Sequence, residues 1–240
     1  MTAIYKRELR SYFTTPIGYI FAGMFLAVSG ILFSMRVLTA DSSGSYSYSG
    51  INTYFVYLLF VFSVLIPLLT MKLLSEEKKQ KTEQLLLTSP VTLTGVVLAK
   101  YLAALTIFAG TLLINSLNYI LLYVYGSPNA AVILSNILGL FLIGASFVAI
   151  GLFLSSITEN QLIAAISSIA AIVALLLISL LADRIESEFV RVILKWFSVV
   201  DRYTPFTNGY FDIPALIYFV SFTGVFLFLT VRVYEKRRWS

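Results

Sequence analysis

The sequence predicts an all-α polytopic membrane protein with six transmembrane helices. Of its 240 residues, 59% are hydrophobic and 12% are charged, and the mean hydropathy is +0.89. A soluble domain has roughly 25% charged residues, and a surface with much less charge is stable only against lipid. The hydrophobic residues also form runs near the ~20 residues that a helical span needs. We therefore treat residues 1–240 as one transmembrane domain, with spans at about 17–35, 54–71, 101–125, 132–157, 162–182 and 213–231.

The distribution of basic residues predicts the orientation of these spans. Cytoplasmic segments of membrane proteins are enriched in Lys and Arg. If both termini are cytoplasmic, 12 of the 17 Lys and Arg residues lie on that side, Lys100 among them, and acidic neighbours mostly offset the other five. We therefore expect a multi-pass protein of the cell (inner) membrane with both termini in the cytoplasm. The five on the outside are Arg36, Arg184, Arg191, Lys195 and Arg202.

Residues 2–16 have the pattern of an amphipathic helix before the first span. One helical face is apolar, with Tyr12 and Phe13 at its end, and the opposite face is basic. Such a helix lies at the membrane surface with its basic side chains toward lipid phosphates, and Pro16 is expected to end it. The alternative is an ordinary basic tail next to the membrane. The candidate surface residues of this elbow helix are Lys6, Arg7, Arg10, Tyr12 and Phe13.

Residues 72–90, KLLSEEKKQKTEQLLLTSP, form the most charged stretch of the chain. Thr82 is suited to cap a short helix, Glu83 would lie in its first turn, and Pro90 would end it. An amphipathic helix between two spans can pass force from a partner into the membrane. The alternative is a solvated loop that only sets the orientation.

Residues 183–212 contain a second amphipathic stretch on the opposite side. Trp residues favour the depth of lipid headgroups. We therefore expect a helix at the outer interface, with charged residues of alternating sign on one face. The apolar face is expected to contain Phe189, Val190, Ile193, Trp196, Phe197 and Val200.

Polar residues inside the spans are few. Asn115 and Asn118 are candidates to line a substrate pathway, although a buried Asn more often bonds a neighbouring helix. Small residues at four-residue spacing favour close helix packing within the subunit, and a dimer seam is the alternative use. The pairs are Ser135/Gly139, Gly151/Ser155, Ala164/Ser168 and Ala170/Ala174.

The composition weighs against an enzyme. The chain has no Cys and no His, which removes thiolate chemistry, the commonest metal ligand and the usual general base. We expect no catalytic residue and no metal site. A lipid-modifying enzyme would need paired acids, but the acids Asp183, Glu186 and Glu188 are spaced to pair with Arg184. The sequence also lacks a GxxxxGK[ST] phosphate loop, so the chain does not itself bind ATP phosphates through that motif.

Two motifs resemble one known family. Residues 82–90 are similar to the Thr-Glu-x-Leu-Leu-x-x-x-Pro end of the coupling region of type-2 ABC transporter permeases, with Lys81 where many members have Gly. Residues 6–21, KRELRSYFTTPIGYIF, resemble the start of gliding-motility GldF-type permeases. The layout of elbow helix, six spans, coupling segment and long outer loop is also similar. The resemblance implies an outer gate at Phe189, Trp196 and Phe197 and a docking surface at Glu76, Glu77, Thr82, Glu83, Leu85, Leu86 and Pro90.

The resemblance further implies the partners. A permease of this family pairs with a second permease copy or homologue and with cytoplasmic ABC ATPase subunits, which bind ATP and Mg, and an auxiliary membrane subunit is a further possible partner. The scarcity of ionisable residues in the spans agrees with an exporter driven by ATP, since ion-coupled carriers usually need such residues. The alternative function is a non-transporting anchor or assembly subunit of a motility or surface complex. No nucleic-acid partner is expected, because the basic excess follows the membrane orientation.

Overall fold

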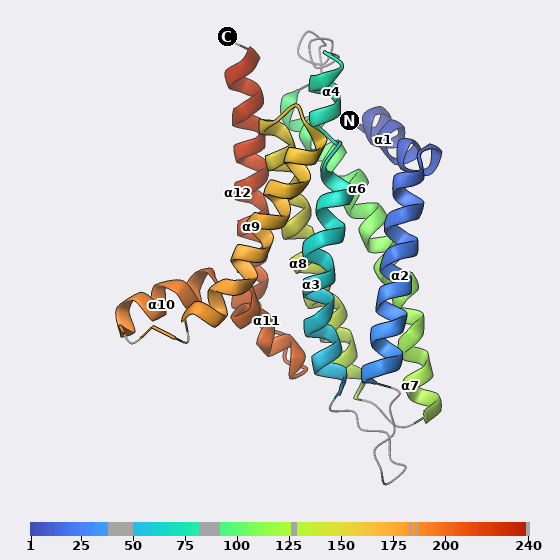
Figure 1. Ribbon diagram of the computed structural model, residues 1–240, viewed down its shortest axis with the longest axis vertical. Helices are drawn as coiled ribbons and strands as arrows, with labels where there is room; N and C mark the ends of the chain where they lie inside the picture. Colours follow the sequence, from blue (N-terminus) through green and yellow to red (C-terminus); the bar gives the residue numbers. More distant parts are fainter. Residues whose placement is uncertain (38–49, 82–91, 126–128, 183, 186, 239–240) are drawn as a thin grey trace.

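The computed structural model describes residues 1–37, 50–81, 92–125, 129–182, 184–185 and 187–238. Within these ranges the protein is helical without strands, and six helices are long and apolar enough to cross a membrane. They run along the long axis of the molecule, and both termini lie at one end (Figure 1). We call this the termini end and the opposite one the far end. The predicted fold class is confirmed. The six are α2 (Pro16–Arg36), α3 (Gly50–Thr70), α6 (Leu93–Asn115), α8 (Ala130–Ile157), α9 (Gln161–Ala182) and α12 (Ile213–Arg238).

The first helix, α1 (Thr2–Thr14), lies across the termini end at a steep angle to α2 (Figure 1). Thr15 separates the two helices with an extended backbone, φ −102° and ψ 153°, and Pro16 is the first residue of α2. A residue before proline avoids the helical region, and proline suits the first helical position, where its missing N–H costs nothing. Pro16 therefore turns the chain from α1 into the first span.

The centre of the bundle is α8, which packs against α3, α6, α9 and α12. Its glycines allow close approach. A Cβ on Gly144 would overlap the ring of Phe108 in α6, and one on Gly151 would overlap Oγ1 of Thr70 in α3. Any larger side chain would push these helices apart. The small residues of this span thus serve contacts within the subunit.

The third span starts earlier than predicted and is not one regular helix. The prediction was residues 101–125, but α6 begins at Leu93, η1 (Ser116–Tyr119) interrupts the helix as a 3₁₀ turn, and α7 (Ile120–Tyr125) follows. The early start places Lys100 within a helix of the bundle, where its side chain is buried. Lys100, which the predicted boundary placed just before the third span, therefore lies within the helix of that span.

The segment between α9 and α12 has a bent shape at the far end. The short helix α10 (Glu188–Phe197) projects sideways from the bundle, and α11 (Val199–Thr207) returns to it (Figure 1). Ser198 makes the bend with an extended backbone, and its side chain accepts a hydrogen bond from the N–H of Asp201. In α11, the carbonyl of Phe206 accepts a hydrogen bond of 2.7 Å from the Ser135 hydroxyl of α8. Val200 therefore belongs to α11, not to the apolar face of α10 as predicted.

Candidate coupling site

The candidate site begins with α4 (Ser75–Lys79), a short helix that follows α3 at the termini end (Figure 1). Ser155 of α8, which is fully buried, holds the junction. Its Oγ accepts hydrogen bonds from the N–H groups of Leu74 (3.2 Å) and Ser75 (3.1 Å), and it donates one to the carbonyl of Met71 (2.9 Å). Free N–H groups at a helix start and free carbonyls at a helix end need such partners. One hydroxyl therefore connects the end of α3 to the start of α4.

Lys100 of α6 is the buried centre of a charge cluster beside α4. Its side chain is 1% exposed. The Nζ atom lies 2.9 Å from Oε1 of Glu77 in α4 and 3.1 Å from Oε1 of Glu8 in α1. It also donates a hydrogen bond of 2.8 Å to the carbonyl of Leu73. These three acceptors match the three N–H bonds of an ammonium group, which explains how a charge can be buried at this depth.

Arg7 completes the cluster from the elbow helix. Its Nη2 lies 2.8 Å from Oε1 of Glu8 and 3.1 Å from Oε1 of Glu77. The cluster formed by Arg7, Glu8, Glu77 and Lys100 has two positive and two negative groups, so its formal charges balance. It joins α1, α4 and α6, three helices from separate parts of the sequence. We call it the four-charge cluster.

The pKa of Glu8 reflects these contacts. Burial alone would raise the pKa of its carboxyl, but the nearby Lys100 ammonium and the hydrogen bonds from Arg7 and Lys100 lower it below its usual value. The hydrogen bond to Glu8 likewise raises the pKa of Arg7. The charged forms of both residues are therefore favoured.

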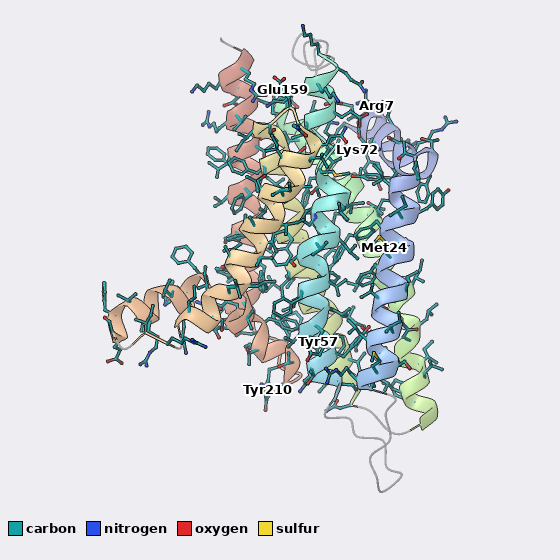
Figure 2. All side chains as sticks on the ribbon, in the orientation of Figure 1. Arg7, Met24, Tyr57, Lys72, Glu159 and Tyr210 are labelled. Atoms are coloured by element: carbon teal, nitrogen blue, oxygen red, sulfur yellow. The ribbon has the colours of Figure 1, made fainter. Side chains whose placement is uncertain are left out.

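A cavity of about 480 Å³ lies between α1, α4 and α6, next to the cluster. Lys72, Glu76 and Gln80 line it together with the cluster residues. Figure 2 shows Arg7 and Lys72 close together at the termini end. The Lys72 ammonium donates a hydrogen bond of 3.2 Å to Oγ1 of Thr15 at the bend between α1 and α2.

The predicted elbow residues divide into two groups. Lys6, Arg10 and Phe13 are exposed, as a membrane-surface helix requires. Tyr12, however, is 2% exposed, and its hydroxyl donates a hydrogen bond to the carbonyl of Leu69 near the end of α3. Tyr12 thus anchors α1 to the bundle rather than lying on the membrane surface. Arg7 is paired with the two carboxylates of the four-charge cluster.

Asn115 lies at the end of α6 in a buried polar network. Its Oδ1 accepts hydrogen bonds from Ser29 (2.7 Å) and Asn118 (3.1 Å), and its Nδ2 donates to the hydroxyls of Tyr54 (3.2 Å) and Tyr119 (3.3 Å). The network joins α2, α3, α6 and η1. These contacts favour the packing interpretation over a pathway lined by Asn115 and Asn118.

The predicted gate residues Phe189, Trp196 and Phe197 all lie on α10, with exposed side chains. Nearby, the guanidinium of Arg202 in α11 lies 5.8 Å from the Trp196 ring centroid and 5.6 Å from that of Tyr218 in α12. Such cation–π contacts join α10 to the bundle.

The predicted docking surface is described only in part. Glu76 and Glu77 lie in the first turn of α4, where the helix dipole favours carboxylates. The others lie outside the described residues, namely Thr82, Glu83, Leu85, Leu86 and Pro90. Among the residues that are described, no three acidic side chains gather as a metal site would require.

The sequence interpretation missed the roles of Lys100 and Glu8, and it assigned Ser155 to close packing without its hydrogen bonds. A signal was present for Lys100, since it stands in the apolar run VVLAKYLAA, and a charge inside such a run needs a partner. Glu8 and the hydrogen bonds of Ser155 carried no comparable signal.

Six spanning helices and a charged element at one end define a polytopic helical membrane protein. Residues 32–236 match the family model described as "ABC-2 family transporter protein". This match covers most of the chain, and the chain therefore belongs to the ABC-2 family as the membrane permease component of an ABC transporter. No curated protein matches the sequence. The N-terminal motif at residues 6–21 lies before the matched region.

Proposed function

We propose that this chain is the permease subunit of an ATP-driven exporter in the inner membrane. In the proposed assembly, it pairs with a second permease copy or homologue and with two cytoplasmic ATPase subunits, which bind ATP and Mg. The family supports the permease role. The absence of a phosphate loop from the sequence supports a separate ATPase chain.

The four-charge cluster is the observation that best supports this proposal. A force on residues 76–90 would enter the bundle through α4, because Ser155 and the cluster connect α4 to α8, α6 and α1. Hydrogen bonds and ion pairs of this kind are short and directional, so they transmit displacement between rigid helices. The proposed docking surface for the ATPase consists of Glu76, Glu77, Thr82, Glu83, Leu85, Leu86 and Pro90.

A charge reversal tests this assignment. The chain is co-expressed with the ATPase encoded by a neighbouring gene, and ATP hydrolysis of the purified complex is measured in lipid. Glu83→Lys should uncouple hydrolysis without reducing membrane insertion. Glu159→Lys is the control, because Glu159 lies in the turn between α8 and α9 at the same end (Figure 2). Equal activity of the two variants would refute the docking surface, and the failure of any ATPase to co-purify would refute the ATP-driven function.

The proposed orientation has a separate test. Because the chain contains no Cys, single cysteines report accessibility without background. Glu159→Cys at the termini end should react with an impermeant maleimide only after the membrane is opened. Tyr210→Cys, at the far end (Figure 2), should react in intact cells. The reverse pattern would place both termini outside and contradict the proposal.

Because residues 6–21 resemble the start of GldF-type permeases, we further propose that the chain is a subunit of a motility or surface complex. A purified complex that hydrolyses ATP while no substrate crosses the membrane would favour the anchor function over export.

A further inference from the structure

An apolar groove of about 330 Å³ lies beneath the elbow helix. Its walls come from α1, α2 and α6, and the lining is almost entirely apolar. On α6 it extends from Thr106 to Ile114, which at 1.5 Å per residue is about 12 Å along the span. This groove is separate from the four-charge cluster, which involves other residues of α1.

Missing side chains create the groove. Gly18 and Ala22 of α2 and Gly110 of α6 line it. A Cβ on Gly110 would meet no atom within 4 Å, whereas one on Gly18 would overlap the carbonyl of Tyr12, so Gly18 serves the close contact between α1 and α2. Because α2 and α6 are spanning helices, an apolar hollow between them is filled by hydrocarbon in a membrane.

The elbow helix covers one end of the groove. Leu9 and Phe13 of α1 form this part of the wall. The hydroxyls of Tyr5 and Thr106, 3.0 Å apart, hold α1 against α6 and keep this overhang in place.

The charge beside the groove is positive. Lys6 lies at the border between the basic and apolar faces of α1, next to Phe13, which is seven positions further along the helix, while Leu9 is three positions further. Lys6 and Arg10 are exposed and form no ion pair with any residue that the structure describes. Arg7, by contrast, is paired with carboxylates of the four-charge cluster. A cation above an apolar groove at the membrane surface matches a lipid with a charged phosphate and one chain to insert.

We propose that the groove binds an anionic phospholipid, with one acyl chain between α1, α2 and α6 and its headgroup at Lys6. The lipid fastens the elbow helix from the membrane side, while the four-charge cluster fastens it to α4 and α6. This inference needs only membrane insertion and is independent of the ATPase partner.

Quenching by brominated lipid tests the proposal. Trp196 and Trp239 are replaced by Phe, and Phe13→Trp supplies a single reporter in the groove wall. The protein is reconstituted in phosphatidylcholine vesicles with about 10 mol% phosphatidylglycerol. In one sample the phosphatidylglycerol is brominated, and in the other an equal amount, about 10 mol%, of brominated phosphatidylcholine replaces unlabelled phosphatidylcholine. Brominated phosphatidylglycerol should quench the reporter about five-fold more effectively than brominated phosphatidylcholine, the factor that one basic side chain near a lipid phosphate supplies.

Matched variants separate the groove from general lipid contact. Gly110→Leu should fill the groove and abolish the preference. Gly23→Leu should retain it, because a Cβ on Gly23 would also meet no atom within 4 Å but Gly23 does not line the groove. Lys6→Gln should remove the preference for phosphatidylglycerol.

Two outcomes would overturn the proposal. Equal quenching by both lipids in the parent protein would refute the anionic assignment. If Gly110→Leu then lowered the quenching by both lipids equally, the groove would bind lipid without regard to its charge. A preference for phosphatidylglycerol that survives Gly110→Leu would place the anionic lipid elsewhere.

Discussion

The ammonium of Lys100 lies 2.9 Å from the carboxylate of Glu77, and this contact joins the third span to the short helix that leaves the second. Lys100 is almost fully buried, while Glu77 keeps 15% of its side chain exposed. The pair therefore lies at the edge of the packed bundle, next to the start of the segment that we propose as the ATPase contact. Because a buried pair resists separation, α4 and α6 are expected to move together.

Removal of Lys100 should destabilise the protein strongly. In Lys100→Met, the carboxylates of Glu8 and Glu77 lose their buried cation, and a loss on the order of 3 kcal/mol is expected. Equilibrium unfolding in mixed micelles measures it. Lys79→Met is the control, since Lys79 is exposed at the end of α4 and its change should stay within about 0.5 kcal/mol. Equal stability of both variants would contradict the structural role of the cluster.

The contribution of Glu8 should depend on pH with a defined sign. Its folded-state pKa lies below the ordinary value of 4.5, so its stabilisation is complete above that value and is lost as the pH falls through the lower folded pKa. The difference in unfolding free energy between the wild type and Glu8→Gln should be constant near neutral pH and shrink in acid below 4.5. A difference that grows in acid would mean that Glu8 is not held as an anion.

Lys81→Gly should stabilise the turn after α4. Lys81 has φ 57°, the left-handed conformation that glycine adopts freely and other residues adopt at a cost of roughly 1 kcal/mol. A gain of about that size is expected in thermal or chemical unfolding. Lys79→Gly, at the last residue of α4 where the backbone is right-handed, should instead cost roughly 0.5 kcal/mol. A loss of stability in both variants would show that the turn does not need glycine.

Gly151→Ala should weaken the contact between α3 and α8. The new Cβ would overlap Oγ1 of Thr70, and overpacking of this kind costs about 1–3 kcal/mol. Gly30→Ala is the matched control, because nothing lies within 4 Å of that position and alanine favours a helix. The melting temperatures of the two variants are compared with that of the wild type. If Gly151→Ala melts at the wild-type temperature, α3 and α8 can separate at low cost, and the prediction is wrong.

Asn115→Ala should lower stability by about 1 kcal/mol, since it leaves Ser29, Tyr54 and Tyr119 without their shared partner. If Asn115 serves packing, ATP hydrolysis by the assembled complex should remain unchanged per folded molecule. A selective loss of substrate-dependent hydrolysis at normal stability would instead support a pathway role.

The sequence by itself determined that this protein lies in a membrane. Long apolar runs cannot be covered in water, so six helical spans and the bend at Pro16 follow from hydropathy and from the fixed φ of proline. The close packing at Gly151 and Ser155 was also foreseeable, because small residues at four-residue spacing permit helix contact whatever the partner.

The tertiary structure alone decided which charges meet. Glu8 and Lys100 are 92 positions apart in the sequence, and Glu77 lies on a third helix, so no local periodicity relates them. Their pairing depends on how α1, α4 and α6 pack, as does the burial of Tyr12 on a helix that sequence periodicity placed at the membrane surface. Periodicity specifies which face of a helix is apolar, whereas only packing specifies what that face contacts.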